Sequence, residues 1–346
     1  MDSCNVVANP LRTEYLNRRK DNMQRFCLML AAAGLACVSM DAEAQVYPSR
    51  PITIIAPFPA GGPLDALARI LAEHMRVSLA QPVIVENVTG ASGSIGTGRV
   101  ARAASDGYTL GLGNWPTHVI NGAVFKLQYD VRNDFDPVSL LATNPLVIVA
   151  KKAMPANDLK ELIAWLKANP HKASQGTSGA GAATHVAGVF FAKEAGTRIQ
   201  FVPYRGAGPA MQDLMAGQID LMIDPAANSL PQFRAGSIKA YAVTAKSRLA
   251  AAPEIPTVDE AGLPGFYVST WLAFFVPRGT PKNIVAKLNA AVVEALADPA
   301  IRRRLAELGH EIPQREQQTP EALGAFHRAE IEKWWPIIKA AGINAE

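Results

Sequence analysis

Three glycine-rich turns carry the residue types that could bind an anion. The first runs from Phe58 to Asp65, between an apolar β-branched run at 52–56 and a helical pattern. Backbone N–H groups at the start of a helix, together with the helix dipole, favour a negatively charged group. Gly62 can cap this helix and Pro63 fits its first position, where no N–H is needed. The turn is therefore suited to holding an anion such as a carboxylate.

Two later turns repeat this chemistry. Residues 174–181 end a strand-like segment, lead into a helical run at 182–195 and add the hydroxyls of Thr177 and Ser178. Residues 201–209 follow the next strand and add Arg205, whose guanidinium suits bidentate pairing with a carboxylate. The alternative for each turn is that it only closes a strand–helix unit. Three such turns without a catalytic group favour a binding protein.

A fourth glycine-rich stretch, Val88 to Gly96, resembles the dinucleotide-binding turn of short-chain dehydrogenases. That reading also needs an acidic residue about 20 positions later, and Asp106 sits instead in a Ser-Asp-Gly turn. The Tyr-x-x-x-Lys pair of those enzymes is absent from the sequence. We therefore expect close strand–helix packing here and no cofactor.

Nucleophilic and metal chemistry have little support in the sequence. The nucleophile motif Gly-x-Ser-x-Gly does not occur, and no two histidines show the spacing of a metalloprotease site. We expect no catalytic residue and no metal ligand. The alternative from another class is an exported hydrolase that uses His118 or His185 with a nearby serine.

Strands and helices alternate along the chain, which predicts an α/β fold with parallel sheets covered by helices. A capping Asp158 begins an amphipathic helix at 159–169, and Thr280-Pro281 and Thr319-Pro320 begin the last two long helices. Trp334, Trp335 and Pro336 indicate core packing with a kink. The strand-like runs are 52–56, 82–88, 108–112, 146–150, 199–203, 219–223, 239–244 and 272–276.

The first 44 residues are expected to be a cleavable export signal. Basic residues precede an apolar segment at 26–40, and Ala42-Glu43-Ala44 fits a cleavage site after Ala44. Translation could start at Met1 or at Met23. The three cysteines, Cys4, Cys27 and Cys37, all lie in this segment, so the mature chain can form neither a disulfide nor a thiolate metal site. A net charge of +4 without a basic run makes nucleic acid an unexpected partner.

From Tyr47 onward the sequence resembles the solute-binding receptors of the tripartite tricarboxylate transporters, also called the Bug family. The resemblance rests on ordered motifs across the whole mature chain. They are Tyr47-Pro48-x-Arg50-Pro51-Ile52, Pro57-Phe58-x-x-Gly61-Gly62-x-x-Asp65-x-x-Ala68-Arg69, Thr117-His118-x-Ile120-Asn121, Gly179-x-Gly181-x-x-x-His185, Val202-Pro203-Tyr204-Arg205-Gly206, Ala235-Gly236-x-Ile238-x-Ala240, Pro256-Thr257-x-x-Glu260-Ala261-Gly262, Ser269-x-Trp271 and Pro277-x-Gly279-Thr280-Pro281.

The resemblance implies a periplasmic receptor with a two-domain periplasmic-binding-protein fold, each domain a sheet flanked by helices. Residues 45–144 plus 273–346 would form domain 1 and residues 145–272 domain 2, hinged at segments near Asn144-Pro145 and Trp271. Such a receptor closes on a small organic acid or amide and delivers it to a membrane permease of one large and one small subunit. A monomer is expected. A sensor that feeds a signalling partner is the alternative.

In such receptors the loops at 58–65 and 177–181 hold a carboxylate through backbone groups and ordered water. This sequence has Leu64 and Ala182 where the family usually has hydroxyls, and Trp115-Pro116 replaces a small polar pair. Apolar walls could instead be supplied by four aromatic rings, those of Phe58, Trp115, Tyr204 and Trp271. A monocarboxylate or amide with an apolar or aromatic body is therefore expected in preference to citrate-like acids.

Arg205 and Asp224 are expected to orient the solute, because both lie beside strand ends, where doubly wound folds place ligands. Pairing between the two side chains, or capping of a turn, is the alternative. The complete set of expected solute contacts is Phe58, Ala60, Gly61, Gly62, Asp65, Asn114, Trp115, Thr117, His118, Thr177, Ser178, Gly179, Gly181, His185, Tyr204, Arg205, Asp224 and Trp271.

Overall fold

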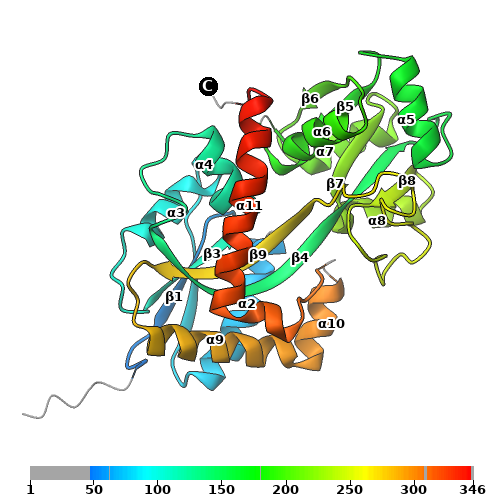
Figure 1. Ribbon diagram of the computed structural model, residues 1–346. Helices are drawn as coiled ribbons and strands as arrows, with labels where there is room; N and C mark the ends of the chain where they lie inside the picture. Colours follow the sequence, from blue (N-terminus) through cyan, green and yellow to red (C-terminus); the bar gives the residue numbers. More distant parts are fainter. Residues whose placement is uncertain (1–46, 62, 180, 308–309, 344–346) are drawn as a thin grey trace, which may run out of the picture. The chain divides into compact units, whose positions relative to one another are not determined.

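The computed structural model describes residues 47–61, 63–179, 181–307 and 310–343 (Figure 1). The expected export signal, its cleavage site after Ala44 and all three cysteines lie outside the described residues, as does the proposed helix cap Gly62. Within the described ranges, no helix combines the length and the apolar character that crossing a membrane requires.

Five strands form a first group in the order β2, β1, β3, β9, β4. Strand β1 contributes its β-branched residues Ile54 and Ile55 to the hydrophobic core, where both are buried. It pairs in parallel with β2 and β3, whereas β9 runs antiparallel to β3 and to β4. The bounds are β1 Ile52–Ala56, β2 Val83–Asn87, β3 Thr109–Asn114, β4 Phe135–Lys151 and β9 Ser269–Pro277.

A second group is built on the far end of β4. There β4 pairs antiparallel with β7 and β8, and β5 pairs in parallel with β7 and β6. The additional bounds are β5 Ser174–Thr177, β6 Gln200–Pro203, β7 Leu221–Pro225 and β8 Ile238–Val243.

Helices connect and cover these strands. They are α2 Pro63–Ser78, α3 Ser94–Ala101, α4 Asn121–Val124, α5 Leu159–Ala168, α6 Ala183–Glu194, α7 Ala207–Met215, α8 Ala226–Arg234, α9 Lys282–Ala297, α10 Pro299–Glu307 and α11 Pro320–Ala340, with short helical turns η1 Ala91–Gly93, η2 Pro116–Ile120 and η3 Arg315–Gln318.

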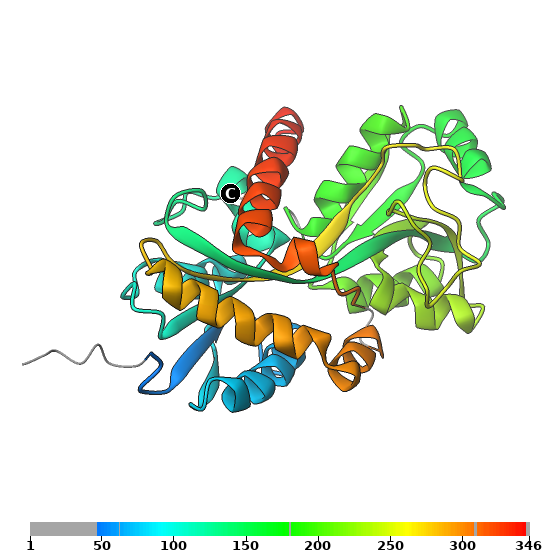
Figure 2. The same cartoon turned by 60° about the horizontal axis from the view of Figure 1, so that its bottom comes forward.

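Strand β4 belongs to both groups, and its partner changes in mid-strand. Pro145 is the last residue paired with β9, and Leu146 is the first paired with β7. Figure 2 shows β4 and β9 side by side between the two groups of helices. The sequence predicted only residues 146–150 of β4, because Pro137 and Pro145 interrupt the preceding strand pattern. The structure accommodates residues 135–145 through register shifts between Pro137 and Ser139 and between Leu140 and Ala142.

The prediction of parallel sheets was therefore incomplete. The βαβ units give parallel pairs, as expected from alternation, but β4 and β9 return between the groups and pair antiparallel with their neighbours. Such long-range pairing leaves no signal in local alternation.

Two of the three predicted side-chain caps are correct. Asp158 accepts a hydrogen bond from the Glu161 N–H, and Thr319 accepts one from the Ala322 N–H. Thr280 was predicted wrongly as a cap of α9, because its hydroxyl donates to the Pro277 carbonyl (2.7 Å) and the helix begins only at Lys282.

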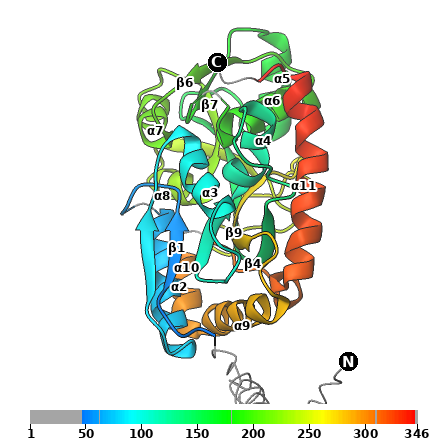
Figure 3. The same cartoon turned by 90° about the vertical axis from the view of Figure 1, so that its left-hand side faces the viewer.

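Helix α11 lies along one side of the sheets, from α9 at one end to α6 at the other (Figure 3). Trp334 is buried and meets Trp115 and Phe190 edge to face, at ring-centroid distances of 4.8 and 5.2 Å. Lys333 of the same helix donates to the Tyr267 carbonyl, just before β9 (2.7 Å). The predicted packing role of the tryptophan cluster is confirmed.

Thr244 should be a main stabilising contact beside the partner change. Its buried hydroxyl lies 3.0 Å from the Leu146 N–H and donates toward the Leu146 and Val268 carbonyls. Thr244→Val keeps the shape but removes these bonds, and we expect the free energy of unfolding to fall by about 1–3 kcal/mol. Urea denaturation measures this change. Thr244→Ser, which keeps the hydroxyl, should lose clearly less, and equal losses would contradict the assignment.

Candidate functional site

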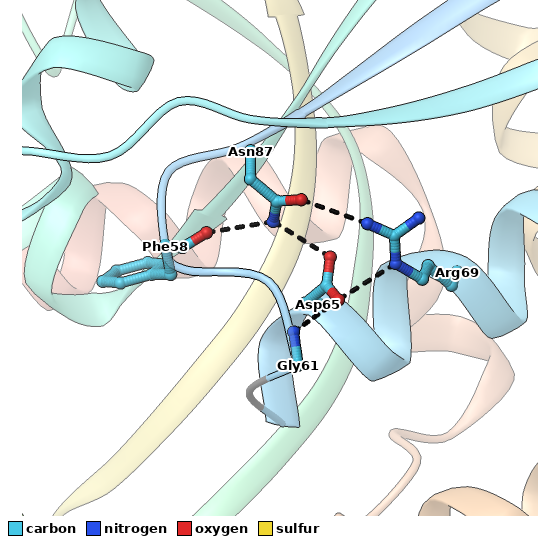
Figure 4. Close-up of polar contacts among 5 residues, drawn as sticks. All are labelled: Phe58, Gly61, Asp65, Arg69 and Asn87. Atoms are coloured by element: carbon cyan, nitrogen blue, oxygen red, sulfur yellow. Dashed lines mark hydrogen bonds and ion pairs between the residues drawn. The ribbon is translucent and has the colours of Figure 1, made fainter.

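The first turn, between β1 and α2, is held by the side chain of Asp65 (Figure 4). One carboxylate oxygen accepts hydrogen bonds from the Gly61 N–H and from Arg69 Nε, both at 2.9 Å. The other accepts from Asn87 Nδ2, also at 2.9 Å. The hydrogen bond from Arg69 is the main reason that the pKa of Asp65 is lowered to about 2. Both oxygens are used within the protein, so Asp65 positions the turn.

Asn87, which the sequence analysis missed, completes this network. It ends β2 beside the end of β1, donates to the Phe58 carbonyl (3.0 Å) and accepts from Arg69 (3.1 Å). The signal available in the sequence was a polar residue at the end of a strand, because the ends of parallel strands meet at one edge. Phe58 is half-buried, whereas Ala60 and Gly61 are exposed and present the backbone of the turn to solvent.

The stretch from Val88 to Gly96 packs against this first turn, as expected. A Cβ on Gly93 would lie 3.3 Å from Pro57 and 3.5 Å from the Phe58 ring, and one on Gly96 would lie 2.5 Å from the Val88 carbonyl oxygen. The approach at Gly96 excludes a side chain, and the positive φ of Gly93, +86°, favours glycine there. The glycines of this stretch thus allow tight packing behind Phe58.

The residues that follow β3 are buried. Asn114 Oδ1 accepts from the Thr117 N–H and hydroxyl, both at 2.9 Å. His118 stacks on Phe275 with centroids 4.2 Å apart, and burial lowers its pKa well below 6.5. Trp115 is fully buried against Trp334. In this conformation these predicted contacts, Asn114, Trp115, Thr117 and His118, stabilise the core.

The aromatic walls proposed from the sequence are reduced to two rings. Trp271 is 1% exposed and its indole N–H lies 3.3 Å from Glu330 Oε2, so it is buried like Trp115. Phe58 and Tyr204 remain half-buried. Tyr204 donates to Asp213 (2.7 Å), and burial together with Asp213 raises the pKa of Tyr204 to about 12.

The second turn, between β5 and α6, is also held by its own side chains. Thr184 Oγ1 accepts from the Ser178 N–H (2.8 Å) and lies 2.9 Å from the Ser178 hydroxyl. The Thr177 hydroxyl is 3.4 Å from the carbonyl of Gly179, which has a positive φ. The Gly181 N–H donates to His185 Nδ1 (3.0 Å). The sequence analysis missed Thr184 because a threonine within a helical segment gives no sign that its hydroxyl contacts the preceding turn.

Arg205 and Asp224, which were expected to orient the solute, do not contact each other and have different surroundings. Arg205 is exposed and forms no ion pair with any described residue, so its guanidinium is available. Asp224 is fully buried, and its Oδ2 accepts from Asn228 and Ser229, each at 2.8 Å. Its Oδ1 has no hydrogen-bond partner among the described residues, and burial raises its pKa to about 7. Asp224 is therefore positioned by α8 and does not pair with Arg205.

Metal binding finds no support in the described ranges, where no group of three or more His, Cys, Asp and Glu side chains is arranged to hold an ion.

Asp65→Asn should loosen the first turn, since one donor to the carboxylate would then face an amide N–H. We expect the free energy of unfolding at pH 7 to fall by about 1–2 kcal/mol, discounted for the exposure of Arg69. The pKa of this acid is lowered, so its contribution is present above about 4 and is lost as the pH falls through about 2. Denaturation at pH 7 and pH 2 measures it. Glu73→Gln, which breaks an exposed pair on the same helix, should change little; an equal loss there would refute the buried network.

Asp224→Asn should have the opposite effect above neutral pH. A buried acid with a raised pKa makes the folded state less stable as the pH rises from about 4 to about 7, because only the unfolded state then ionises freely. The variant should be more stable than the wild type at pH 8, by about 2–4 kcal/mol, and similar to it at pH 4. Urea denaturation at both pH values tests this. Asp220→Asn, which removes the partner of Lys151 (2.6 Å), should instead destabilise; a gain for both variants would contradict the prediction.

Comparison with known proteins places this chain in a family. The tripartite tricarboxylate transporter family receptor model matches residues 67–343. MatC from Rhodopseudomonas palustris, solved with bound malate, is 40% identical, covers 84% of this chain and 100% of its own, and superimposes with a TM-score of 0.73. The periplasmic binding protein BugD is 39% identical, and the match covers 86% of this chain and 100% of BugD with a TM-score of 0.72.

An R. palustris protein solved with adipate is 33% identical, with 86% of this chain and 100% of its own covered and a TM-score of 0.74. These neighbours share the two-domain periplasmic-binding-protein fold, and the family model describes a receptor, so the hydrolase alternative is not retained. The chain belongs to the tripartite tricarboxylate transporter receptor family, the Bug family of solute-binding proteins.

Proposed function

We propose that this protein is a periplasmic receptor that captures a small organic acid and delivers it to a tripartite tricarboxylate-type permease of one large and one small subunit. The observation that carries the proposal is the pair of internally braced turns, at 58–65 and 177–185, each beside a helix start. Turns that are held in place beside a helix start can receive an anion without a further ordering cost. Residues 45–144 plus 273–346 and residues 145–272 are the proposed closing domains.

The partner change within β4 supports a hinge at the proposed boundary. Residues up to Pro145 pair with β9 and residues from Leu146 pair with β7. A bend at this point would move the second turn relative to the first and leave each group of strands intact. Hinges of this kind absorb large backbone changes in a few residues at element boundaries.

The class of solute follows from charge. The exposed Arg205 and the two helix starts beside the turns favour a carboxylate, and relatives were solved with malate and with adipate. The expected preference for an aromatic body rested on four rings, two of which are buried. We therefore propose a small carboxylate with no requirement for an aromatic group, and we keep an amide as a member of the test panel.

A thermal-shift panel of malate, adipate, citrate, benzoate and nicotinamide tests this proposal. A bound acid at a hundred times its Kd should stabilise the protein by about 2.7 kcal/mol. Small acids such as malate or adipate should raise the Tm, and nicotinamide should not. Stabilisation by nicotinamide alone would show that the carboxylate assignment is wrong.

An acid that binds in this panel can then be used to test the role of Arg205 and the closure of the domains. Arg205→Ala should weaken binding tenfold or more in calorimetry with an unchanged Tm of the solute-free protein, because the side chain is exposed. Arg198→Ala is the matched control, with no change in affinity expected.

Solution scattering should show a smaller radius of gyration at saturating acid, and an unchanged profile would argue against closure. Uptake of the acid by cells carrying the permease, with and without the receptor, tests delivery.

A further inference from the structure

His185 is placed to control the second turn. It lies in the first part of α6, and its Nδ1 accepts the hydrogen bond of the Gly181 N–H at 3.0 Å. A nitrogen that accepts an N–H carries no proton, so the neutral ring holds its proton on Nε2. The ring also meets Phe201 of β6 edge to face, with centroids 4.9 Å apart. The hydrogen bond to Gly181 therefore exists only while Nδ1 is unprotonated.

Gly181 is also where the second turn approaches elements from elsewhere in the chain. Its φ is +71°, and a Cβ added there would lie 3.4 Å from Val124 Cγ1 of α4 and 3.9 Å from Ile343 Cγ2, beyond α11. Both side chains are buried. A shift of Gly181 would thus alter the second turn and its approach to α4 together.

We propose that His185 is a positioning residue: its neutral ring holds the β5–α6 turn in the binding geometry, and protonation of Nδ1 releases Gly181 and weakens the solute. This inference rests on the proposed function, since it concerns the same turn. The protein would then hold its solute at neutral pH and release it in acid, taking up one proton.

The surroundings of the ring favour this role. Its partners Phe201 from β6 and the backbone of Gly181 from the turn are uncharged. Among the described residues no charged side chain contributes to the shift, and burial alone lowers the pKa of His185 below 6.5. No described carboxylate therefore stabilises the protonated ring once the bond to Gly181 is lost.

The direction of the pH effect follows from linkage. The bound geometry requires an unprotonated Nδ1, so the pKa of His185 is lower in the bound state than in a turn from which Gly181 has been released. Affinity is therefore highest at neutral pH and falls as the pH decreases. The Kd of the wild type should be higher at pH 5.5 than at pH 7.5.

Two variants of similar size separate this role from simple packing. His185→Asn places an amide oxygen where Nδ1 lies and cannot titrate, so its Kd for malate or adipate should not show the increase of the wild type between pH 7.5 and pH 5.5. His185→Gln places its amide where Nε2 lies and leaves Gly181 without an acceptor, so it should bind weakly at both pH values. Titration of the acid itself is common to all three proteins and cancels in the comparison. Wild type and His185→Asn with the same pH profile would overturn the proposal.

A measurement without solute separates this inference from the proposed function. Nuclear magnetic resonance of the solute-free protein should show His185 with its proton on Nε2, and the Gly181 amide shift should titrate together with the ring. A Gly181 amide that stays constant while His185 titrates would overturn the positioning role. If neither malate nor adipate binds at any pH, the proposed solute class fails, and the amide titration by itself decides the assignment of His185.

Discussion

Strand β4 has to serve two groups of strands at once, and the arrangement of the chain depends on that requirement. Its first part pairs with β9 and its second part with β7 and β8, with the change between Pro145 and Leu146. Proline at the change removes a backbone donor just where one ladder ends and the next begins. Thr244 and the segment before β9 then supply the hydrogen bonds that this point needs. Each group of strands is thus ordered on its own side of this short segment, as the proposed hinge requires.

The turns of the proposed anion site illustrate a second constraint, because a site that is ordered before its ligand arrives binds at a lower entropic cost. Asp65 brings Gly61, Arg69 and Asn87 together around one buried carboxylate, and Thr184 and His185 do the same for Ser178 and Gly181 with neutral groups. The first network is insensitive to pH near neutrality, because the pKa of Asp65 is about 2. The second depends on an imidazole. The two turns therefore differ in the conditions under which they remain ordered.

Helix α11 explains why several aromatic residues cannot reach a solute in this conformation. It supplies Trp334 against Trp115 and Phe326 against Trp271, at centroid distances of 4.8 and 5.6 Å. Burying such large rings yields more stabilisation than most other side chains could provide at these positions. Lys333 and Trp334 extend the same contact to Tyr267 and Phe190. The aromatic content near the motifs is thus largely structural.

The sequence by itself determined the local features of this protein: the β-branched strand β1, the helix starts at Asp158 and Thr319, the glycine-rich turns and the family. The strand, the helix starts and the turns depend on residues close together in the chain, where propensity and capping act directly, whereas the family is recognised from motifs spread along the chain. Only the tertiary structure decided which side chains face the turns. Asn87 and Asp65 are 22 positions apart, and Trp115 and Trp334 are much farther apart. The antiparallel pairing of β4 with β9 likewise joins distant segments. Burial and hydrogen-bond partners at such separations depend on how the whole chain packs, and no short stretch of sequence contains that information.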